Sequence, residues 1–322
     1  MTSAPLLPSV IEAMEASPLV ALDRLTKAAG VEGRILAKLD YLLPGFSKKD
    51  RAARRIVEDA RASGTLASGQ TVVELTSGNM GTGLAIVCAV LGHPFVAVMS
   101  AGNSPERARM MRALGAEVVL VPQTAGGTLG KVSGADLDLV EAEAQRLTKA
   151  RNAFRADQFE RWGNAAAHED GTGAEILAQS GGIVTAFCDF VGTGGTLAGC
   201  ARAFAAAGKD IRCYAAEPEG GESIGGGDQS RPDHPIQGGG YSRANLTHLK
   251  GMKLAGTVAV SGEAARDTAR MLARTEGIFG GYSGGANVAA ALELLRDREK
   301  SGVVAVIIAD SGLKYLSTDL WE

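Results

Sequence analysis

The sequence predicts an α/β protein of two lobes, each built on a mostly parallel, twisted sheet flanked by helices. Short apolar runs rich in β-branched residues alternate with amphipathic helical stretches, a pattern typical of βαβ units. Runs such as those at 72–76 and 303–310 are apolar on both faces, as strands covered by helices on both sides should be. The 322 residues, 45% hydrophobic and 21% charged, suit about two soluble domains.

Eight apolar runs predict strands, and seven amphipathic stretches predict the helices between them. The predicted strands are residues 35–39, 71–75, 95–100, 117–122, 183–191, 211–218, 257–261 and 303–310. The predicted helices are residues 49–63, 81–91, 104–114, 136–148, 196–207, 262–275 and 284–298.

Two polar, Gly-rich stretches interrupt this alternation, at 124–134 and 217–240. Because the α/β pattern resumes after each, we interpret both as loops near a site rather than as linkers. The pattern changes over near residues 151–158. We therefore expect an N-terminal α/β domain at 43–152 and a C-terminal one formed by 1–42 with 153–322.

Composition excludes several classes of function. The net charge of −3 gives no electrostatic footprint for nucleic acid or an anionic membrane. The first residues have no basic start before an apolar core, and no apolar stretch reaches the roughly 18 residues of a membrane span. The four cysteines form no CxxC pair, so we predict no metal site. A cytoplasmic location is the expectation.

The strongest local motif is Phe190-Val-Gly-Thr-Gly-Gly-Thr-Leu-Ala-Gly199. An apolar strand ends, a Gly/Thr loop follows and a helix begins, which exposes free N–H groups that suit a phosphate. A dinucleotide fingerprint fails because position 197 is Leu, and a Walker A loop fails here and at residues 126–132. The alternative is a plain strand–helix turn.

A second strand–helix junction reads Glu74-Leu-Thr-Ser-Gly-Asn-Met-Gly-Thr-Gly83. Hydroxyls, an amide and helix N–H groups gather there, and together they suit a carboxylate. The alternative is a simple helix cap made by Ser77 or Asn79.

Two adjacent lysines, Lys48 and Lys49, open the predicted helix at 49–63. An amine placed among cations and helix N–H groups has its pKa lowered, which favours a nucleophile. A solvated, charged first turn is the alternative. A Gly-rich turn at 276–287 likewise enters a helix and leaves Ser283 free to point into a cleft, or else packs closely against neighbouring backbone.

In this order, the four motifs resemble the cysteine synthase family, the β-family of pyridoxal-phosphate enzymes that also contains cystathionine β-synthase. The resemblance runs from Pro18-Leu-Val-Ala-Leu22 to Asp310-Ser-Gly-Leu-Lys-Tyr-Leu-Ser-Thr318. Ser47-Lys-Lys-Asp-Arg51 is similar to the family's S-x-K-D-R, and His234-Pro-Ile-Gln-Gly-Gly-Gly240 to H-x-I-Q-G-x-G. The resemblance implies a fold of the tryptophan synthase β type, fold type II.

The resemblance also implies a role for individual residues. Lys49 would bind the cofactor covalently and act as the general base. Pyridoxal 5′-phosphate would be held by Lys49, Asn79, Gly192, Thr193, Gly194, Gly195, Thr196 and Ser283. The amino-acid substrate would meet Thr76, Ser77, Gly78, Asn79, Met80, Gln158 and Gly238.

The implied activity is β-replacement on an O-activated L-serine, most simply O-acetylserine plus sulfide giving L-cysteine and acetate. The family further implies a homodimer, a mobile subdomain at about 95–134 that closes over the substrate, and a possible complex with a serine acetyltransferase. Such a partner would insert a C-terminal tail into the active site.

The sequence departs from the family pattern around the substrate. Met80 stands where the family usually has Thr, Tyr282 is bulkier than the usual residue, and Asn287 replaces the common Ala. Another donor or nucleophile therefore remains open: O-phosphoserine, homocysteine or an amine. So does a β-eliminating lyase. A non-catalytic binding protein on the same fold and a nicotinamide dehydrogenase are rivals that the intact motifs and the missing dinucleotide fingerprint disfavour.

Overall fold

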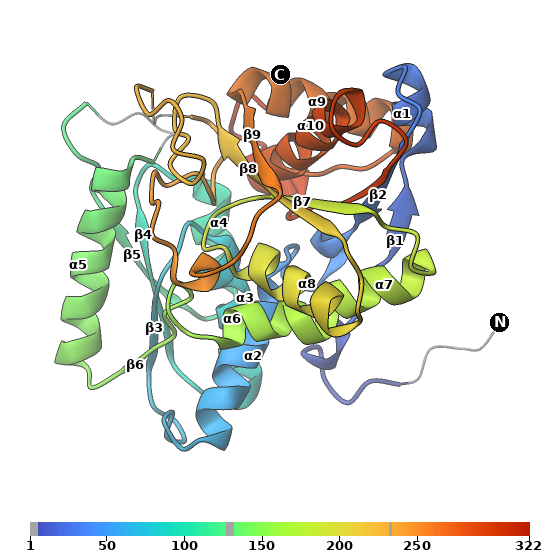
Figure 1. Cartoon of the computed structure of the whole chain (residues 1–322). Helices are drawn as coiled ribbons and strands as arrows, with labels where there is room; N and C mark the ends of the chain where they lie inside the picture. Colours follow the sequence, from blue (N-terminus) through green and yellow to red (C-terminus); the bar gives the residue numbers. More distant parts are fainter. Residues whose placement is uncertain (1–5, 127–131, 232–233) are drawn as a thin grey trace.

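The computed structural model describes residues 6–126, 132–231 and 234–322, and Figure 1 shows them as two sheets with helices packed around each. The larger sheet has the strand order β1-β2-β10-β7-β8-β9, and the smaller has β5-β4-β3-β6. All pairings are parallel except that of β1 with β2. The predicted fold class is confirmed.

The large sheet consists of β1 (Leu19–Ala21), β2 (Arg34–Lys38), β7 (Ala186–Phe190), β8 (Arg212–Pro218), β9 (Gly256–Val260) and β10 (Val303–Ile307). The small sheet consists of β3 (Val72–Leu75), β4 (Phe95–Ser100), β5 (Glu117–Val121) and β6 (Phe154–Arg155). We call the two halves of the molecule the large lobe and the small lobe after these sheets.

Helices cover both faces of each sheet. The large lobe carries α1 (Asp23–Ala28), α6 (Gly163–Ala167), α7 (Ala174–Ser180), α8 (Gly195–Ala206), α9 (Gly262–Glu276) and α10 (Tyr282–Arg296). The small lobe carries α2 (Lys49–Ala62), α3 (Asn79–Leu91), α4 (Pro105–Ala113) and α5 (Gly134–Ala150). A short π-helical segment, η3 (His168–Gly173), joins α6 to α7, and η4 (Thr247–Leu249) and η5 (Gly312–Tyr315) are single 3-10 turns near the site.

Each sheet has an apolar core on both faces, because successive side chains along a strand point to opposite faces and most of them are apolar. In the large lobe one core lies under α9 and α10, and the other under α8. In the small lobe one core lies under α2 and α3, and the other under α5, which packs Leu137, Val140, Ala144 and Leu147 against β3 and β4. Both lobes are therefore rigid frames for the loops at the strand ends.

The elements that the sequence analysis missed are short. β1 has three residues and β6 has two, which is too few to show an alternating pattern. The run α6–η3–α7 contains three glycines in Gly163–Gly173, which hide its helical period. β6 pairs with β3, so the small sheet extends to Arg155, past the expected boundary at residue 152.

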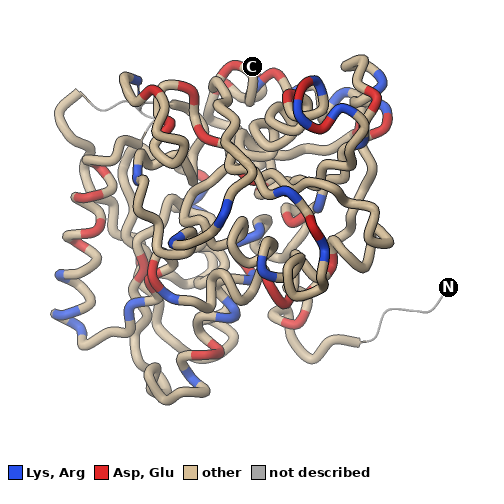
Figure 2. Tube along the Cα trace, viewed as in Figure 1, with Lys and Arg blue, Asp and Glu red and all other residues tan. Residues whose placement is uncertain are grey.

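Charge is dispersed over the described part of the chain. Along α5 the acidic residues come first and the basic residues last, and both kinds lie over the outer helices (Figure 2). Among the described residues, no helix is long and apolar enough to cross a bilayer. All four cysteines are free and buried.

Candidate active site

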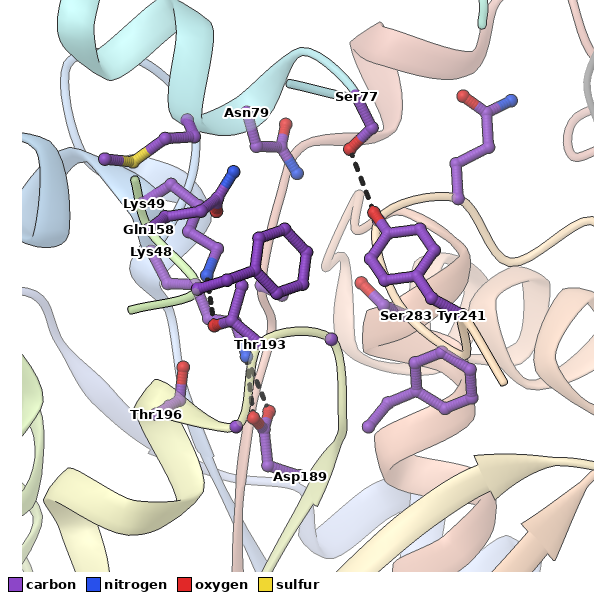
Figure 3. A pocket seen from close by; sticks show the side chains of 18 of the residues that line it. Lys48, Lys49, Ser77, Asn79, Gln158, Asp189, Thr193, Thr196, Tyr241 and Ser283 are labelled. Carbon is purple, nitrogen blue, oxygen red and sulfur yellow. Dashed lines mark hydrogen bonds and ion pairs between the residues drawn. The ribbon is translucent and has the colours of Figure 1, made fainter. Parts of the chain in front are cut away.

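A cavity opens where the carboxyl ends of β3 and β7 lead into their loops, the edge at which open α/β sheets bind ligands. Residues from both lobes line it, and Figure 3 shows that their side chains converge. The lining residues are Lys48, Lys49, Leu75, Ser77, Asn79, Met80, Gln158, Phe159, Asp189, Phe190, Gly192, Thr193, Gly194, Thr196, Gln237, Gly238, Tyr241, Ser283 and Ala309.

Eleven of the fourteen residues singled out from the sequence line this cavity, so the four motifs do come together in space. The remaining three, Thr76, Gly78 and Gly195, lie directly behind the lining. Thr76 and Gly78 shape the loop after β3, and Gly195 begins α8 against Asn164.

The loop between β7 and α8 is a cradle of backbone. Gly194, the residue before α8, has a left-handed φ of 82°, and no side chain caps the first turn of the helix. A Cβ on Gly192 would lie 2.6 Å from the carbonyl oxygen of Gly238, so only glycine fits there. The N–H groups at the start of α8 thus face a hollow where a phosphate can sit at a helix N-terminus.

Two hydroxyls of this loop are held in place from behind. The Thr193 hydroxyl accepts a 2.9 Å hydrogen bond from the Asn164 amide. The Thr196 hydroxyl lies 3.2 Å from Nε2 of His168, whose Nδ1 lies 2.9 Å from the Thr172 hydroxyl. Burial holds the pKa of His168 well below its usual value, so this imidazole is neutral at pH 7.

Lys49, the first residue of α2, reaches into the cavity from the small lobe. Its Nζ donates to the Thr193 hydroxyl at 3.4 Å, so the amine lies beside the phosphate cradle (Figure 3). Burial, followed by the nearby Lys48 cation, lowers the pKa of Lys49 to about 7. The sequence analysis anticipated the lowered pKa but ascribed it to cations and helix N–H groups, whereas burial is the larger cause.

The loop after β3 faces the cradle across the cavity. The Thr76 hydroxyl accepts 2.9 Å hydrogen bonds from the N–H groups of Gly78 and Gly81, which fixes the turn into α3. Gly78 has a φ of 123° and lies against Arg107, whose side chain a Cβ would meet at 2.7 Å. Ser77, Asn79 and Met80 are left to line the cavity.

Buried charges hold Asn79 from below. Its Oδ1 accepts from Nζ of Lys314 at 2.9 Å and from Arg107 at 3.3 Å, and its Nδ2 donates to Asp310 at 2.8 Å. Arg107 also donates to the Ser77 carbonyl oxygen at 3.1 Å and has a fully buried guanidinium. An amide nitrogen carries two hydrogens, so one Nδ2 hydrogen remains beyond the bond to Asp310.

The third wall comes from the segment after β6 and from the loop between β8 and β9. Gln158, which follows β6, donates through Nε2 to the Leu75 carbonyl oxygen at 3.2 Å. Gly238 lies opposite Ser77, because a Cβ on this glycine would lie 3.7 Å from the serine hydroxyl. The Tyr241 hydroxyl lies 3.4 Å from the same serine oxygen (Figure 3).

Several lining residues were not singled out as site residues from the sequence. Lys48 was considered only as the rival to Lys49, although its Nζ forms an ion pair with Asp189 at 2.7 Å inside the cavity. Asp189 could have been noticed as a lone charge in the apolar run at 183–191. Nothing in the sequence points to Tyr241, whose place follows from the path of the loop.

The cavity fits pyridoxal phosphate on the evidence of its own residues. The cradle of Gly192–Thr196 suits the phosphate, and a lysine of lowered pKa suits the aldehyde. The Ser283 hydroxyl at the start of α10 lies in the same cavity as Asn79 (Figure 3). Among the described residues, no cluster of three His, Cys, Asp or Glu could hold a metal ion in its place.

Comparison with known proteins agrees with this reading. Residues 10–310 match the family described as pyridoxal-phosphate dependent enzyme. The chain is 37% identical over 330 positions to O-ureido-L-serine synthase of Streptomyces lavendulae, covering 99% of this chain and 94% of that protein. It is 36% identical over 317 positions to cysteine synthase 3 of Caenorhabditis elegans, covering 95% and 87%.

A solved structure of a similar enzyme has the same fold. The O-acetylserine dependent cystathionine β-synthase of Helicobacter pylori superposes with a TM-score of 0.89 at 28% identity, over 99% of this chain and 100% of that one. The family match spans most of the chain, and the two relatives named above cover 95% or more of it. This chain therefore belongs to the pyridoxal-phosphate-dependent enzymes and is one of the cysteine synthase type.

Proposed function

We propose that this enzyme replaces the β-substituent of an O-activated L-serine, with O-acetylserine as donor and, in the simplest case, sulfide as nucleophile, giving L-cysteine and acetate. One observation carries the proposal. The amine of Lys49 lies 3.4 Å from Thr193 of the phosphate cradle, in a cavity whose opposite wall is the loop of Ser77, Asn79 and Met80.

When bound, the cofactor supplies the electron sink for negative charge at the substrate α-carbon. Lys49 has two tasks in this proposal: it would hold the cofactor, and once the substrate amine has displaced it from the cofactor, its free Nζ would take the proton from the α-carbon. A general base works best when its pKa is close to the working pH, and the pKa of about 7 meets that condition.

The remaining residues orient the two molecules. Gly192–Thr196 would hold the phosphate, Asn79 and Ser283 would hydrogen-bond the cofactor ring, and Thr76–Met80 with Gln158 and Gly238 would receive the substrate carboxylate. Thr76, Gly78 and Gly195 act through the backbone that they shape. If Ser283, rather than an Asp, partners the ring nitrogen, that nitrogen would be only weakly polarised, which would favour elimination and replacement over transamination.

Closure of the small lobe over the substrate is also part of the proposal, with a mobile subdomain at about 95–134, of which residues 127–131 lie outside the described chain. The loop that carries Tyr241 already reaches the small lobe, because Arg243 forms a 3.0 Å ion pair with Asp138 of α5. Closure would exclude water from the reacting β-carbon. A homodimer is the assembly that we expect.

A second candidate nucleophile has a specific observation in its favour. The relative that is 37% identical is a synthase of O-ureido-L-serine, and Met80 places an apolar side chain, 1% exposed, in the wall where the family usually has Thr. An oxygen nucleophile such as hydroxyurea would build an O-ureido product by the same replacement. O-phosphoserine, homocysteine or an amine, and net elimination, are the further alternatives.

The visible spectrum of the purified enzyme tests the proposal. We expect a band from cofactor bound to Lys49, absent in Lys49→Ala, that shifts to longer wavelength on adding O-acetylserine. Sulfide and hydroxyurea are then added separately, and the one that restores the original band faster is the better nucleophile. A band that neither O-acetylserine nor O-phosphoserine shifts would refute the donor, and no band at all would refute the role of Lys49.

A further inference from the structure

A buried ion pair crosses from the small lobe to the large lobe inside the cavity. Nζ of Lys48, the residue before α2, lies 2.7 and 2.8 Å from the two carboxylate oxygens of Asp189 in β7. The two side chains are only 10% and 4% exposed. The pair joins the start of the helix that carries Lys49 to the strand that enters the phosphate cradle (Figure 3).

A third residue fixes the pair to α10. Nδ2 of Asn287 donates to the Ile307 carbonyl oxygen at 2.7 Å and to Asp189 at 3.3 Å, and its Oδ1 accepts from the backbone N–H of Phe190. Asn287 lies one helical turn after Ser283, on the same face of α10. The lysine helix, the cradle strand and the helix of Ser283 therefore meet at Asp189.

Stability alone does not explain such a pair. The free-energy cost of removing two charges from water often exceeds the gain from their attraction. Replacing a buried ion pair with apolar residues is therefore frequently neutral or stabilising. The position of Lys48 next to Lys49 suggests a reason of a different kind.

We propose that Lys48 and Asp189 form a positioning pair, which fixes the Lys49 amine beside the phosphate cradle and keeps a balanced cation and anion next to that amine. The inference deepens the proposed function, because it rests on Lys49 as the cofactor lysine. Neither Lys48 nor Asp189 is asked to touch the substrate.

The titratable groups that act on Lys49 come from five segments of the chain. Lys48, before α2, lowers the pKa of Lys49, while Asp189 of β7 and Glu74 of β3 raise it. His168 of η3 and His248 of η4 also lie nearby, and burial lowers the pKa of both, so they are neutral at pH 7. Lys48 and Asp189 therefore act on the Lys49 amine with opposite signs.

Substitutions of one partner at a time test this opposition. Lys48→Met leaves the anion beside Lys49 and should raise the pKa of Lys49, whereas Asp189→Asn leaves the cation and should lower it, each by roughly one pH unit. The measurement is the pH dependence of acylation of Lys49 in the cofactor-free protein, followed by mass spectrometry. Because the neutral amine reacts, the labelling curve should move to higher pH in the first variant and to lower pH in the second.

Lys38→Met is the matched control, because Lys38 is also buried and paired with a carboxylate, that of Glu175, but does not line the cavity. We expect no change in the labelling curve of Lys49. Shifts of the same direction in both single variants, or shifts no larger than that of the control, would overturn the proposal, because a merely structural pair would act in that way.

The double variant Lys48→Met/Asp189→Leu decides the matter if a single variant fails to fold. It removes both charges of the pair, so its melting temperature should equal or exceed that of the wild type. The labelling curve should return close to that of the wild type, while the affinity for added pyridoxal phosphate should fall about tenfold because the amine is no longer held. Wild-type affinity in a folded double variant would overturn the proposal.

These outcomes separate the two proposals. Labelling reports on Lys49 without cofactor or substrate, so the opposite shifts can appear even if no donor turns over. Conversely, a normal cofactor spectrum and normal turnover in the double variant would leave the proposed function standing and refute the positioning pair.

Discussion

The two walls of the cavity are built in different ways. The phosphate cradle after β7 is made of backbone: glycines that leave no room for a Cβ and helix N–H groups that no side chain caps. The loop after β3, residues 76–80, is the wall that we propose for the substrate, and we call it the substrate loop. It is equally tight at Gly78, but buried charged side chains hold it: Arg107, Lys314 and Asp310 surround Asn79. The cradle depends on shape, and the substrate loop depends on ionic contacts.

This difference suits the two ligands that we propose. A cofactor phosphate is always the same, so a preformed cradle of N–H groups serves it without adjustment. The substrate loop must meet an amino acid that arrives and departs. Arg107 of α4 contacts Asp310, and Ser104, the residue before α4, donates to the Lys314 carbonyl oxygen. The start of α4 is therefore joined to the large lobe beneath that loop.

The largest effect should follow from Arg107→Met, which would leave the carboxylate of Asp310 with one buried cation fewer. Breaking a buried ion pair costs about 3–5 kcal/mol of unfolding free energy. Denaturant unfolding measures the loss, and Arg109→Met, an exposed arginine of the same helix, is the control. In the surviving folded protein, we expect KM for the amino acid to rise by a larger factor than the cofactor affinity falls, because Arg107 supports Asn79 as well as the Ser77 carbonyl oxygen. Equal damage to cofactor affinity would break the comparison.

A smaller effect, on the opposite wall, should follow from Gly192→Ala. The new methyl group would lie 2.6 Å from the Gly238 carbonyl oxygen, and such overpacking costs about 1–3 kcal/mol. Here the affinity for pyridoxal phosphate should fall, as measured by absorbance titration of the cofactor-free protein. Gly134→Ala meets only an ordinary contact at 3.7 Å and should change nothing. Unchanged affinity in Gly192→Ala would show that the cradle tolerates side chains.

The smallest effect on stability should come from Met80→Thr, which replaces a buried thioether in the substrate wall with a hydroxyl. We expect the ratio of kcat/KM for sulfide to that for an oxygen nucleophile to change, with little effect on cofactor affinity. Competition between the two nucleophiles in one reaction measures that ratio. An unchanged ratio would mean that position 80 does not set specificity.

The sequence predicted most of the fold because its strands are apolar and its helices amphipathic. All eight predicted strands and all seven predicted helices are present, with ends that move by a few residues. What it missed was too short or too rich in glycine to show a period, as in β6 and η3. The local residue pattern cannot show that β6 pairs with β3, because that pairing joins segments far apart in the chain.

The sequence predicted the motifs that line the site, but not the residues behind them that hold those motifs in place. Gly192–Thr196 and Thr76–Met80 are contiguous and could be read directly, whereas Arg107 and Asp310 are 203 residues apart in the chain. Lys48 and Asp189 are separated by 141 residues, and neither sequence segment indicates that the two side chains form an ion pair. Contacts between distant segments of this kind depend on tertiary packing.

The four buried thiols have a practical consequence for such experiments. Burial raises the pKa of Cys88 to about 12, and it raises those of Cys188, Cys200 and Cys213 as well. Because the thiolate is the reactive form, the native enzyme should be almost silent to alkylating reagents, and each molecule that unfolds should become labelled. The increase in mass from cysteine alkylation therefore reports the extent of unfolding of each variant, without a dye or an added tag.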